Sequence, residues 1–366
     1  MIKFLDEYRD PELAQRLVKK IRNHALRGLR LMEFCGGHTV AIMKYGLRQL
    51  LFPQVELLSG PGCPVCVTAN ADIDKAIALA KKPEIILTTF GDMLKVPGSY
   101  SSLQKIRADN GDVRIVYSAQ DALEIAQGNR DKKVVFLGIG FETTAPTIAA
   151  SILEAKNREI KNYYVLSLHK LCPPVIKALL DSGEIKLDGI ILPGHVSTII
   201  GSYPYEFIPR DYGIGGVVAG FEPLDILLTV EMLIAQIEHR KPLIEIAYRR
   251  GVKPEGNIKA REIMETVFEI TEANWRGLGR VPASGLTLKR EYQDFDAEAS
   301  FVLEAIPAKE PEGCVCGEIL RGIKTPLNCR LFGSYCTPEQ PVGPCMVSSE
   351  GSCAAYYLYG GENNGR

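Results

Sequence analysis

Short apolar runs alternate with longer segments of helical periodicity between about residue 31 and residue 240 of the chain. Runs of this length separated by helical segments are typical of parallel strands in βα units. The pattern therefore predicts an α/β core. The clearest runs lie at residues 55–58, 84–89, 113–117, 134–139, 163–168, 188–192 and 216–219.

Two halves of this core resemble each other when the chain is shifted against itself by roughly 103 to 109 residues. Five pairs of segments then match in the same order: 34–39 with 139–144, 57–64 with 165–173, 91 with 194, 98–100 with 201–203, and 121–123 with 225–227. Glycine-rich turns common to all βα units are the alternative explanation. We expect two similar parallel-sheet α/β domains, at 28–128 and 129–242, that face each other across a cleft.

A third unit follows Pro242 and is rich in glycine, proline and cysteine. A helix is expected at 261–271, where apolar residues recur at helical spacing. A further helix is expected within residues 1–25, from the spacing of Leu13, Leu17 and Ile21. We assign this helix to the third unit, so that a C-terminal iron-sulfur domain comprises 243–366 together with 1–25.

Charge and hydropathy exclude several classes of protein. Lys and Arg number 43 and Asp and Glu 44, so the net charge of −1 provides no field for a nucleic acid or an anionic membrane. No apolar stretch reaches the roughly 20 residues that a membrane helix needs. The first fifteen residues lack the apolar core of a secretion signal, so we expect a cytoplasmic protein.

Ten cysteines are present, and six of them fall between Cys314 and Cys353. Cytosolic thiols stay reduced, so the group is more typical of a metal site than of a disulfide framework. The spacing C-x-C-x12-C-x6-C-x8-C-x7-C lacks the paired knuckles of most zinc sites and favours a 4Fe-4S cluster. Zinc and metal-free thiols are the alternatives. If the segment from Cys314 to Cys316 is extended, its two side chains point to opposite sides, and only one of them is a ligand.

The segment G-P-G-C-P-V-C places Cys63 and Cys66 after a strand and a tight turn, at the start of a helix. A helix N-terminus lowers a thiol pKa, and a C-x-x-C pair can close a disulfide. We therefore expect a redox dithiol on an exposed turn, with two buried structural cysteines as the alternative.

Cys35 and His38 form a third candidate site, because C-G-G-H offers a thiolate and an imidazole on a glycine turn after a strand. Such a pair could hold a metal ion with open positions or act as a Cys-His nucleophile. Glu142 in G-F-E-T-T and His195 in P-G-H-V-S lie on other turns that follow strands, so we include both as candidates for the same cleft.

Taken together, these motifs resemble those of the HypD family of hydrogenase maturation proteins. The resemblance covers essentially the whole chain. It is carried by C-G-G-H-T, G-P-G-C-P-V-C, G-F-E-T-T, P-G-H-V-S and the tail C-T-P-E-Q-P-V-G-P-C-M-V-S-S-E-G-S-C-A-A-Y-Y.

The resemblance implies a scaffold that builds the iron centre of nickel-iron hydrogenases, in which iron carries two cyanides and one carbon monoxide. The family acts as a maturation factor rather than a turnover enzyme. The implied partners are a small HypC-family chaperone, whose N-terminal cysteine shares the iron, and a HypE-family protein that delivers cyanide.

The resemblance also implies roles for individual residues. Cys35 would hold the iron with His38 as its neighbour, and Cys63 and Cys66 would be a redox pair. The 4Fe-4S ligands would be Cys314, Cys329, Cys336 and Cys353. Cys316 and Cys345 would then form a second thiol pair beside the cluster, an arrangement similar to ferredoxin-thioredoxin reductase.

Elementary chemistry agrees with these roles, because a soft thiolate suits ferrous iron and a cluster with dithiols can supply electrons. Two other classes use the same residues. One is a cluster-containing thiol-disulfide oxidoreductase without iron-cyanide cargo, and the other is a zinc-stabilised metabolic α/β enzyme.

Overall fold

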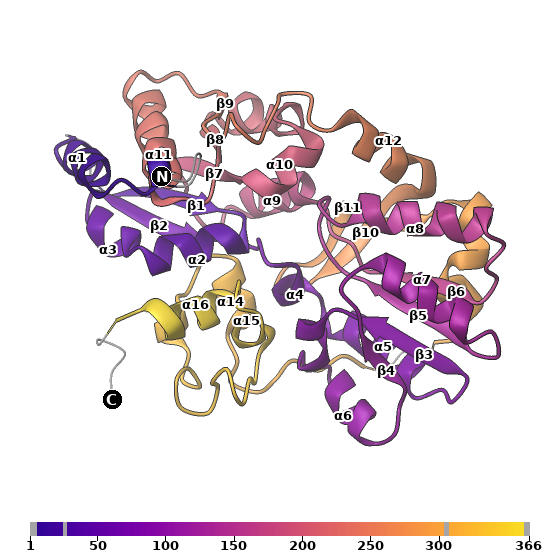
Figure 1. The fold of residues 1–366 in the computed structure, drawn as a ribbon. Coiled ribbons are helices and arrows are strands. Elements are labelled where there is room, and N and C mark those ends of the chain that lie inside the picture. Colours follow the sequence, from indigo (N-terminus) through magenta and orange to yellow (C-terminus); the bar gives the residue numbers. More distant parts are fainter. Residues whose placement is uncertain (1–5, 25–27, 304–306, 362–366) are drawn as a thin grey trace.

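The parallel strands expected from the apolar runs are present, and they form two separate sheets (Figure 1). The computed structural model describes residues 6–24, 28–303 and 307–361. The first sheet has the order β2-β1-β7-β8-β9 and the second the order β4-β3-β5-β6, all parallel. Their bounds are β1 Leu29–Glu33, β2 Val55–Ser59, β3 Ile85–Thr89, β4 Val113–Ile115, β5 Lys133–Gly138, β6 Tyr163–Ser167, β7 Gly189–Pro193, β8 Gly215–Ala219 and β9 Ile244–Ile246.

The two sheets share one strand order, which supports the duplication seen in the sequence. When the halves of the chain are aligned, β1 to β4 correspond to β5 to β8. The series β2-β1-β7-β8 then matches β6-β5-β3-β4 strand for strand. Apart from β9, which follows the second half, each sheet therefore takes two strands from each half.

Sheet membership does not follow the expected boundary at residue 128. A division into 28–128 and 129–242 would separate β1 and β2 from β7 and β8, with which they share a sheet. It would also separate β3 and β4 from β5 and β6. The chain crosses from the first sheet to the second after β2 and returns to the first sheet after β6. Each sheet therefore contains strands from both halves of the chain.

Helices cover the sheets and join them. Those beside the first sheet are α1 Pro11–Arg22, α2 Gly36–Lys44, α3 Leu47–Leu51, α9 Cys172–Ser182, α10 Gly194–Ile200 and α11 Pro223–Glu238. Those beside the second are α5 Asn70–Ala80, α6 Leu103–Ala108, α7 Ala119–Gly128 and α8 Ala145–Asn157. The short helix α4, Pro64–Val67, lies where the chain crosses between the sheets (Figure 1).

The N-terminal helix α1 packs on the first sheet's lobe, so its assignment to the C-terminal unit is wrong. Asp10 caps the helix through hydrogen bonds from the N–H groups of Glu12 and Leu13. Leu17 and Ile21 are buried in one core cluster with residues of α11 and β1. This apolar stripe faces α11, which lies beside α1 in Figure 1.

The helix expected at 261–271 ends early. Helix α12 spans Ile258–Val267, and the chain then forms an antiparallel hairpin of β10 Phe268–Trp275 and β11 Gly279–Leu288. Phe268 and Ile270, which fit the helical spacing, stand at alternate positions of β10. Alternation over a short amphipathic stretch also fits a strand, and pairing with β11 decides the outcome.

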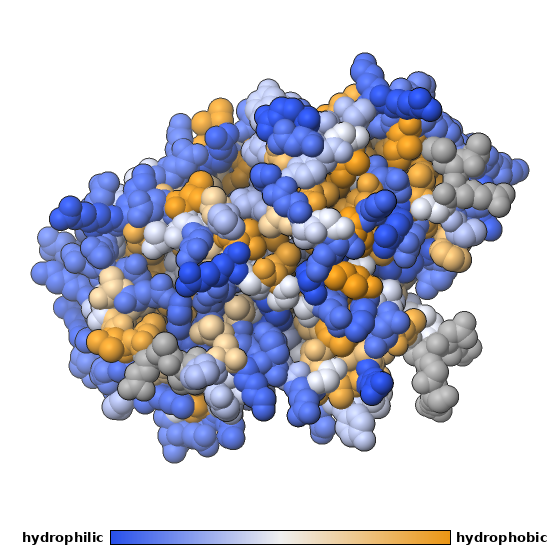
Figure 2. Space-filling view, turned by 180° about the vertical axis from the view of Figure 1, so that it is seen from behind, coloured by the Kyte–Doolittle hydropathy of each residue, from blue (hydrophilic) through white to orange (hydrophobic). Residues whose placement is uncertain are grey.

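The cysteine-rich end of the C-terminal unit includes the short α-helices α14 Cys316–Leu320, α15 Pro344–Val347 and α16 Ser352–Tyr359. In Figure 1 they form the yellow group below the first sheet, next to α2 and α4. Earlier in the same unit, the short helix α13 Ala297–Ser300 packs on β6. The face in Figure 2 is mainly hydrophilic, with hydrophobic residues interspersed, and no described helix is long and apolar enough to cross a bilayer.

Candidate functional site

The carboxyl ends of three neighbouring strands bring together the turns that carry Cys35, His195 and Phe221. β7 pairs with β1 on one side and with β8 on the other, and all three are parallel. Cys35 follows β1 and caps α2, His195 lies in the first turn of α10 after β7, and Phe221 follows β8. Turns at this edge of a parallel sheet are the usual place for a ligand.

Glu33, the last residue of β1, holds the Cys35 turn in place. Its carboxylate accepts a hydrogen bond from the N–H of Cys35 at 2.8 Å and another from the hydroxyl of Thr39. The N–H of Gly36 donates to the carbonyl of Gly62 at 3.1 Å. A Cβ on Gly62 would lie 2.2 Å from the backbone nitrogen of Cys35, so only glycine permits this approach. Glu33 was not predicted as a site residue. The only indication in the sequence is that an acidic residue ends an apolar strand.

Cys35 is a buried thiol that stays protonated at neutral pH. Desolvation raises its pKa to about 12, and the carboxylates of Glu350 and Glu33 add to the rise. The N–H groups of Gly37 and His38 at the start of α2 act in the opposite direction. A metal ion that binds this sulfur must therefore displace a proton.

His38 presents a neutral imidazole with a free lone pair. Its Nε2 lies 3.2 Å from the carbonyl oxygen of Ala219, which can only accept, so Nε2 carries the hydrogen. Nδ1 is buried and has no hydrogen-bond partner among the described residues. Burial also lowers the pKa of His38 to about 4. This is the state of histidine that binds a metal or accepts a proton.

Phe221 lies between two histidines. Its ring stacks on His38 with centroids 4.7 Å apart and on His195 with centroids 3.8 Å apart. A Cβ on Gly37 would lie 3.1 Å from the Phe221 ring and 3.7 Å from the sulfur of Cys35, so little space separates them. The sequence analysis did not single out this ring, because the stacking depends on strand order.

Cys63 and Cys66 are buried, so the expectation of an exposed turn is wrong. Cys63 caps α4, and its sulfur accepts a hydrogen bond from the N–H of Cys66 at 3.3 Å. The C-terminal unit covers the pair: the Cys66 thiol lies 3.9 Å from the carbonyl of Pro344 and hydrogen-bonds to Cys345. Burial raises the pKa of Cys66, and the hydrogen bond with Cys345 only partly opposes this rise.

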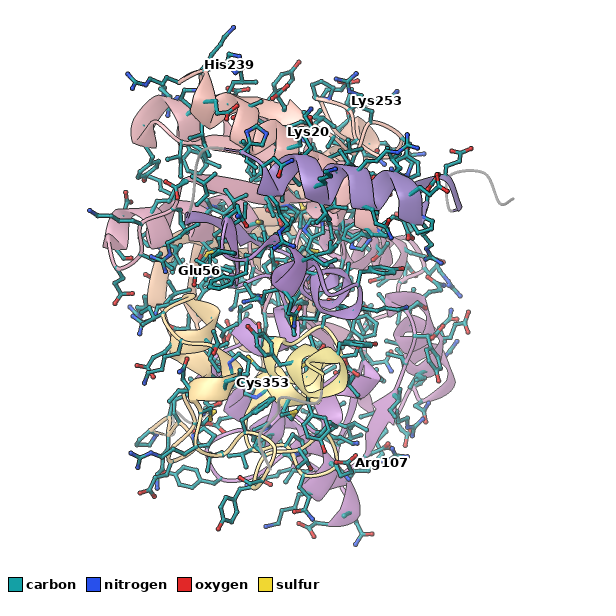
Figure 3. All side chains as sticks on the ribbon, turned by 90° about the vertical axis from the view of Figure 1, so that its left-hand side faces the viewer. Lys20, Glu56, Arg107, His239, Lys253 and Cys353 are labelled. Atoms are coloured by element: carbon teal, nitrogen blue, oxygen red, sulfur yellow. The ribbon has the colours of Figure 1, made fainter. Side chains whose placement is uncertain are left out.

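The six C-terminal cysteines line a single small cavity of about 10 Å³. Three of them come from different helices: Cys316 from α14, Cys345 from α15 and Cys353, labelled in Figure 3, from α16. Their thiols form a connected series, since Cys345 hydrogen-bonds to Cys316, Cys353 and Cys66. The remaining members of the cavity's thiol set are Cys314, Cys329 and Cys336.

The Cys314–Cys316 segment is not extended, so the expectation that its side chains point apart is wrong. Val315 has φ −105° and ψ 25°, and Cys316 begins α14. The two thiols consequently hydrogen-bond to each other. Which of them is a ligand cannot follow from strand geometry.

The donor chemistry of this cavity fits an iron-sulfur cluster, because six thiols and no other ionisable side chain line it. The described residues include no group of three or more His, Cys, Asp or Glu side chains already close enough to hold a metal ion. The six thiols therefore line one cavity but do not form a complete coordination sphere.

Glu142 lies in a second buried polar cluster on the turn after β5. Its Oε1 accepts the N–H of Cys172 at 2.8 Å, while its Oε2 is buried with no partner among the described residues. Burial raises the pKa of Glu142 to about 7. The Cys172 thiol in turn contacts the hydroxyl of Tyr205, and burial raises the pKa of both groups.

These features define a thiol-rich α/β protein with a cysteine-histidine pair at the edge of one sheet and a separate group of cysteines in its C-terminal unit. A model of the HypD family, described as "Hydrogenase formation hypA family", matches residues 12–360. The chain therefore belongs to the HypD family of hydrogenase maturation factors.

Similar proteins from bacteria and an archaeon match along almost their full lengths. Hydrogenase maturation factor HypD2 of Bradyrhizobium diazoefficiens is 47% identical over 369 residues, covering 98% of this chain and 97% of that protein. Hydrogenase maturation factor HypD of Cupriavidus necator is 46% identical over the same length and coverage. A putative hydrogenase expression/formation protein of Methanocaldococcus jannaschii is 45% identical over 352 residues, covering 96% of this chain and 98% of that protein.

Proposed function

We propose that the chain is a scaffold on which iron acquires cyanide and carbon monoxide for a nickel-iron hydrogenase. Iron is the cargo, and Cys35 holds it with His38 beside it. The observation that carries the proposal is that the start of α2 holds a buried thiol and, three residues on, a neutral imidazole whose Nδ1 has no partner among the described residues. A soft sulfur and a borderline nitrogen donor suit ferrous iron.

The chain's residues prepare this site before iron binds. Glu33 fixes the backbone of Cys35, and Ala219 fixes the ring of His38 through its Nε2. Binding of the iron removes the thiol proton, and the free Nδ1 of His38 is a suitable ligand, because burial keeps its imidazole neutral. Glu142 and His195 line neighbouring turns, where we place them as supporting groups.

Electrons would come from two dithiols and from an iron-sulfur cluster bound in the C-terminal cavity. We place a 4Fe-4S cluster on Cys314, Cys329, Cys336 and Cys353, where it would supply one-electron transfer when bound. Cys63 with Cys66, and Cys316 with Cys345, would form the two dithiols. Each dithiol that closes to a disulfide releases two electrons and two protons, and the contact between Cys66 and Cys345 joins the two pairs.

The partners that fit this function are a small HypC-family chaperone that shares the iron and a HypE-family protein that delivers cyanide. We place the work in the cytoplasm, where these thiols stay reduced. The chain would act as a maturation factor and not turn over a free substrate.

Replacing Cys35 by Ala tests the proposal. In the complex isolated with its small partner, we expect the infrared bands of iron-bound cyanide and carbon monoxide to disappear, because the anchoring sulfur is lost. The fold, measured by circular dichroism, should not change. Cys172→Ala, which removes another buried thiol at a strand-to-helix turn, is the matched control and should keep the bands. Bands of wild-type strength in the Cys35 variant would refute the assignment.

A thiol-disulfide oxidoreductase without cargo is the second candidate, and the hydrogen bond between Cys66 and Cys345 favours it. The same infrared measurement separates the two, because a simple oxidoreductase carries no cyanide or carbon monoxide bands in any variant. A zinc-stabilised enzyme would show zinc in place of iron in metal analysis.

A further inference from the structure

Arg276 is a buried cation at the tip of the β10–β11 hairpin, and neither the sequence motifs nor the proposed scaffold uses it. Its side chain is 1% exposed. Its Nη2 donates to the carbonyl of Thr68 at 2.9 Å, and its Nη1 donates to Glu310 at 2.5 Å. Its Nε has no partner among the described residues. Burial of a guanidinium costs free energy, which its bonds to Glu310 and Thr68 partly offset.

The contacts of Arg276 join the two sets of thiols. On one side, its backbone N–H donates to the carbonyl of Val67 at 2.8 Å and its guanidinium to that of Thr68, so that it binds the free carbonyls at the end of α4. Helix α4 is only four residues long and carries Cys66. On the other side, Glu310 lies four residues before Cys314.

The next residue of the hairpin packs against the start of α14. A Cβ on Gly277 would lie 2.5 Å from the Cα of Gly317, and a Cβ on Gly317 would lie 2.9 Å from the Cα of Gly277. Two backbones are thus in direct contact beside Cys316, the first residue of α14. Thr68 also forms a bridge with Trp275. The hairpin tip therefore packs against both α4 and α14.

We propose that Arg276 is the positioning residue that holds Cys66 of the C-x-x-C pair against Cys345 of the C-terminal unit. The role rests on the proposed thiol function, because it concerns disulfide exchange between the two pairs. In that exchange, the Cys345 thiolate attacks Cys66 of a Cys63–Cys66 disulfide and Cys63 leaves as a thiolate. Cys316 then attacks Cys345 and releases Cys66. The disulfide moves from one pair to the other, so electrons and sulfur bonds balance without an external oxidant.

The test uses the full-length protein in which Cys63→Ser and Cys316→Ser leave Cys66 and Cys345 without their usual partners. Mild oxidation with glutathione disulfide should trap a Cys66–Cys345 disulfide, detected by mass mapping of alkylated peptides. Adding Arg276→Gln should slow its formation at least tenfold, because α4 loses the donor that fixes its end. Arg280→Gln, on the same hairpin but in the exposed pair with Glu272, should leave the rate unchanged.

Two further variants keep the test decisive. Arg276→Lys retains the charge with fewer donors and should give an intermediate rate, even if the Gln variant folds poorly. Glu310→Gln leaves the Thr68 contact intact and should slow the exchange less than Arg276→Gln. Equal crosslinking in the Arg276→Gln or Arg276→Lys protein and the parent would overturn the role of Arg276 alone. Absence of any crosslink in the parent would overturn the thiol exchange itself, and with it this inference.

Discussion

At the scale of single residues, the site consists of ionisable groups whose pKa values burial shifts toward the neutral form. The pKa values of Cys35, Glu33 and Glu142 are raised by desolvation, and that of His38 is lowered by it. Cys35 and His38 could be predicted from residue type and from the glycine turn. Their protonation states could not, because these depend on what the rest of the chain packs around them.

Glu142 gives this burial a measurable consequence. Its pKa is about 7 in the folded protein against an ordinary value of 4.5, so between these pH values the folded state binds more protons than the unfolded state. Its contribution to the free energy of unfolding is therefore present below about pH 4.5 and is lost as pH rises through 7, by up to about 3 kcal/mol.

Glu142→Gln removes this titration but keeps an oxygen for the N–H of Cys172. Urea unfolding at pH 5 and pH 8 should show the wild type losing about 2 to 3 kcal/mol more than the variant over that interval. Glu33 titrates in both proteins and cancels from the difference. Parallel stability curves for the two proteins would contradict the prediction.

At the scale of elements, short helices and turns determine which thiols meet. The sequence indicated that the C-x-x-C pair begins a helix, and α4 confirms this. The sequence did not indicate that the pair is buried, because α15, which covers it, lies about 280 residues further along the chain. The hairpin β10–β11, which carries Arg276, was not expected at all, since its first strand also fits a helical spacing.

The division of the C-terminal cysteines is a prediction at this scale. Cys316 and Cys345 hydrogen-bond to each other from the starts of α14 and α15, as a dithiol requires. Anaerobically prepared Cys316→Ser and Cys345→Ser proteins should keep about four irons and four sulfides per chain. Serine at any of the four proposed ligands, Cys314, Cys329, Cys336 or Cys353, should lose or degrade the cluster. Iron and sulfide analysis with visible absorbance measures this, and a cluster that survives without Cys314 but not without Cys316 would reverse the assignment.

At the scale of the whole molecule, two repeats of the chain build the sheets by exchanging strands. The positions of the buried parallel strands up to β8 were predicted, because each is a short apolar run with a turn after it. The half-buried β9 and the hairpin strands β10 and β11 were not. Their partners were not, because an apolar run carries no information about which neighbour it pairs with. β1 could have paired with β3 of its own half, but it pairs with β7 of the other half. The expected boundary at residue 128 failed for that reason.

The exchange of strands predicts how the molecule opens. Segments 29–59 and 189–219 share a sheet, so they should unfold together although about 130 residues separate them, whereas 85–167 should form a second unit. Ile191→Ala in β7 and Ile86→Ala in β3 are a matched pair, since both side chains are fully buried in central strands. Each substitution should lower the free energy of unfolding by about 2 to 4 kcal/mol.

In native-state hydrogen exchange at low denaturant, Ile191→Ala should speed exchange in 29–59 as much as in 189–219, by roughly 30-fold or more, and leave 85–167 unchanged. Ile86→Ala should do the reverse. If Ile191→Ala instead loosened the continuous stretch from 133 to 219 and spared 29–59, the unit of stability would follow the halves of the chain and not the sheets.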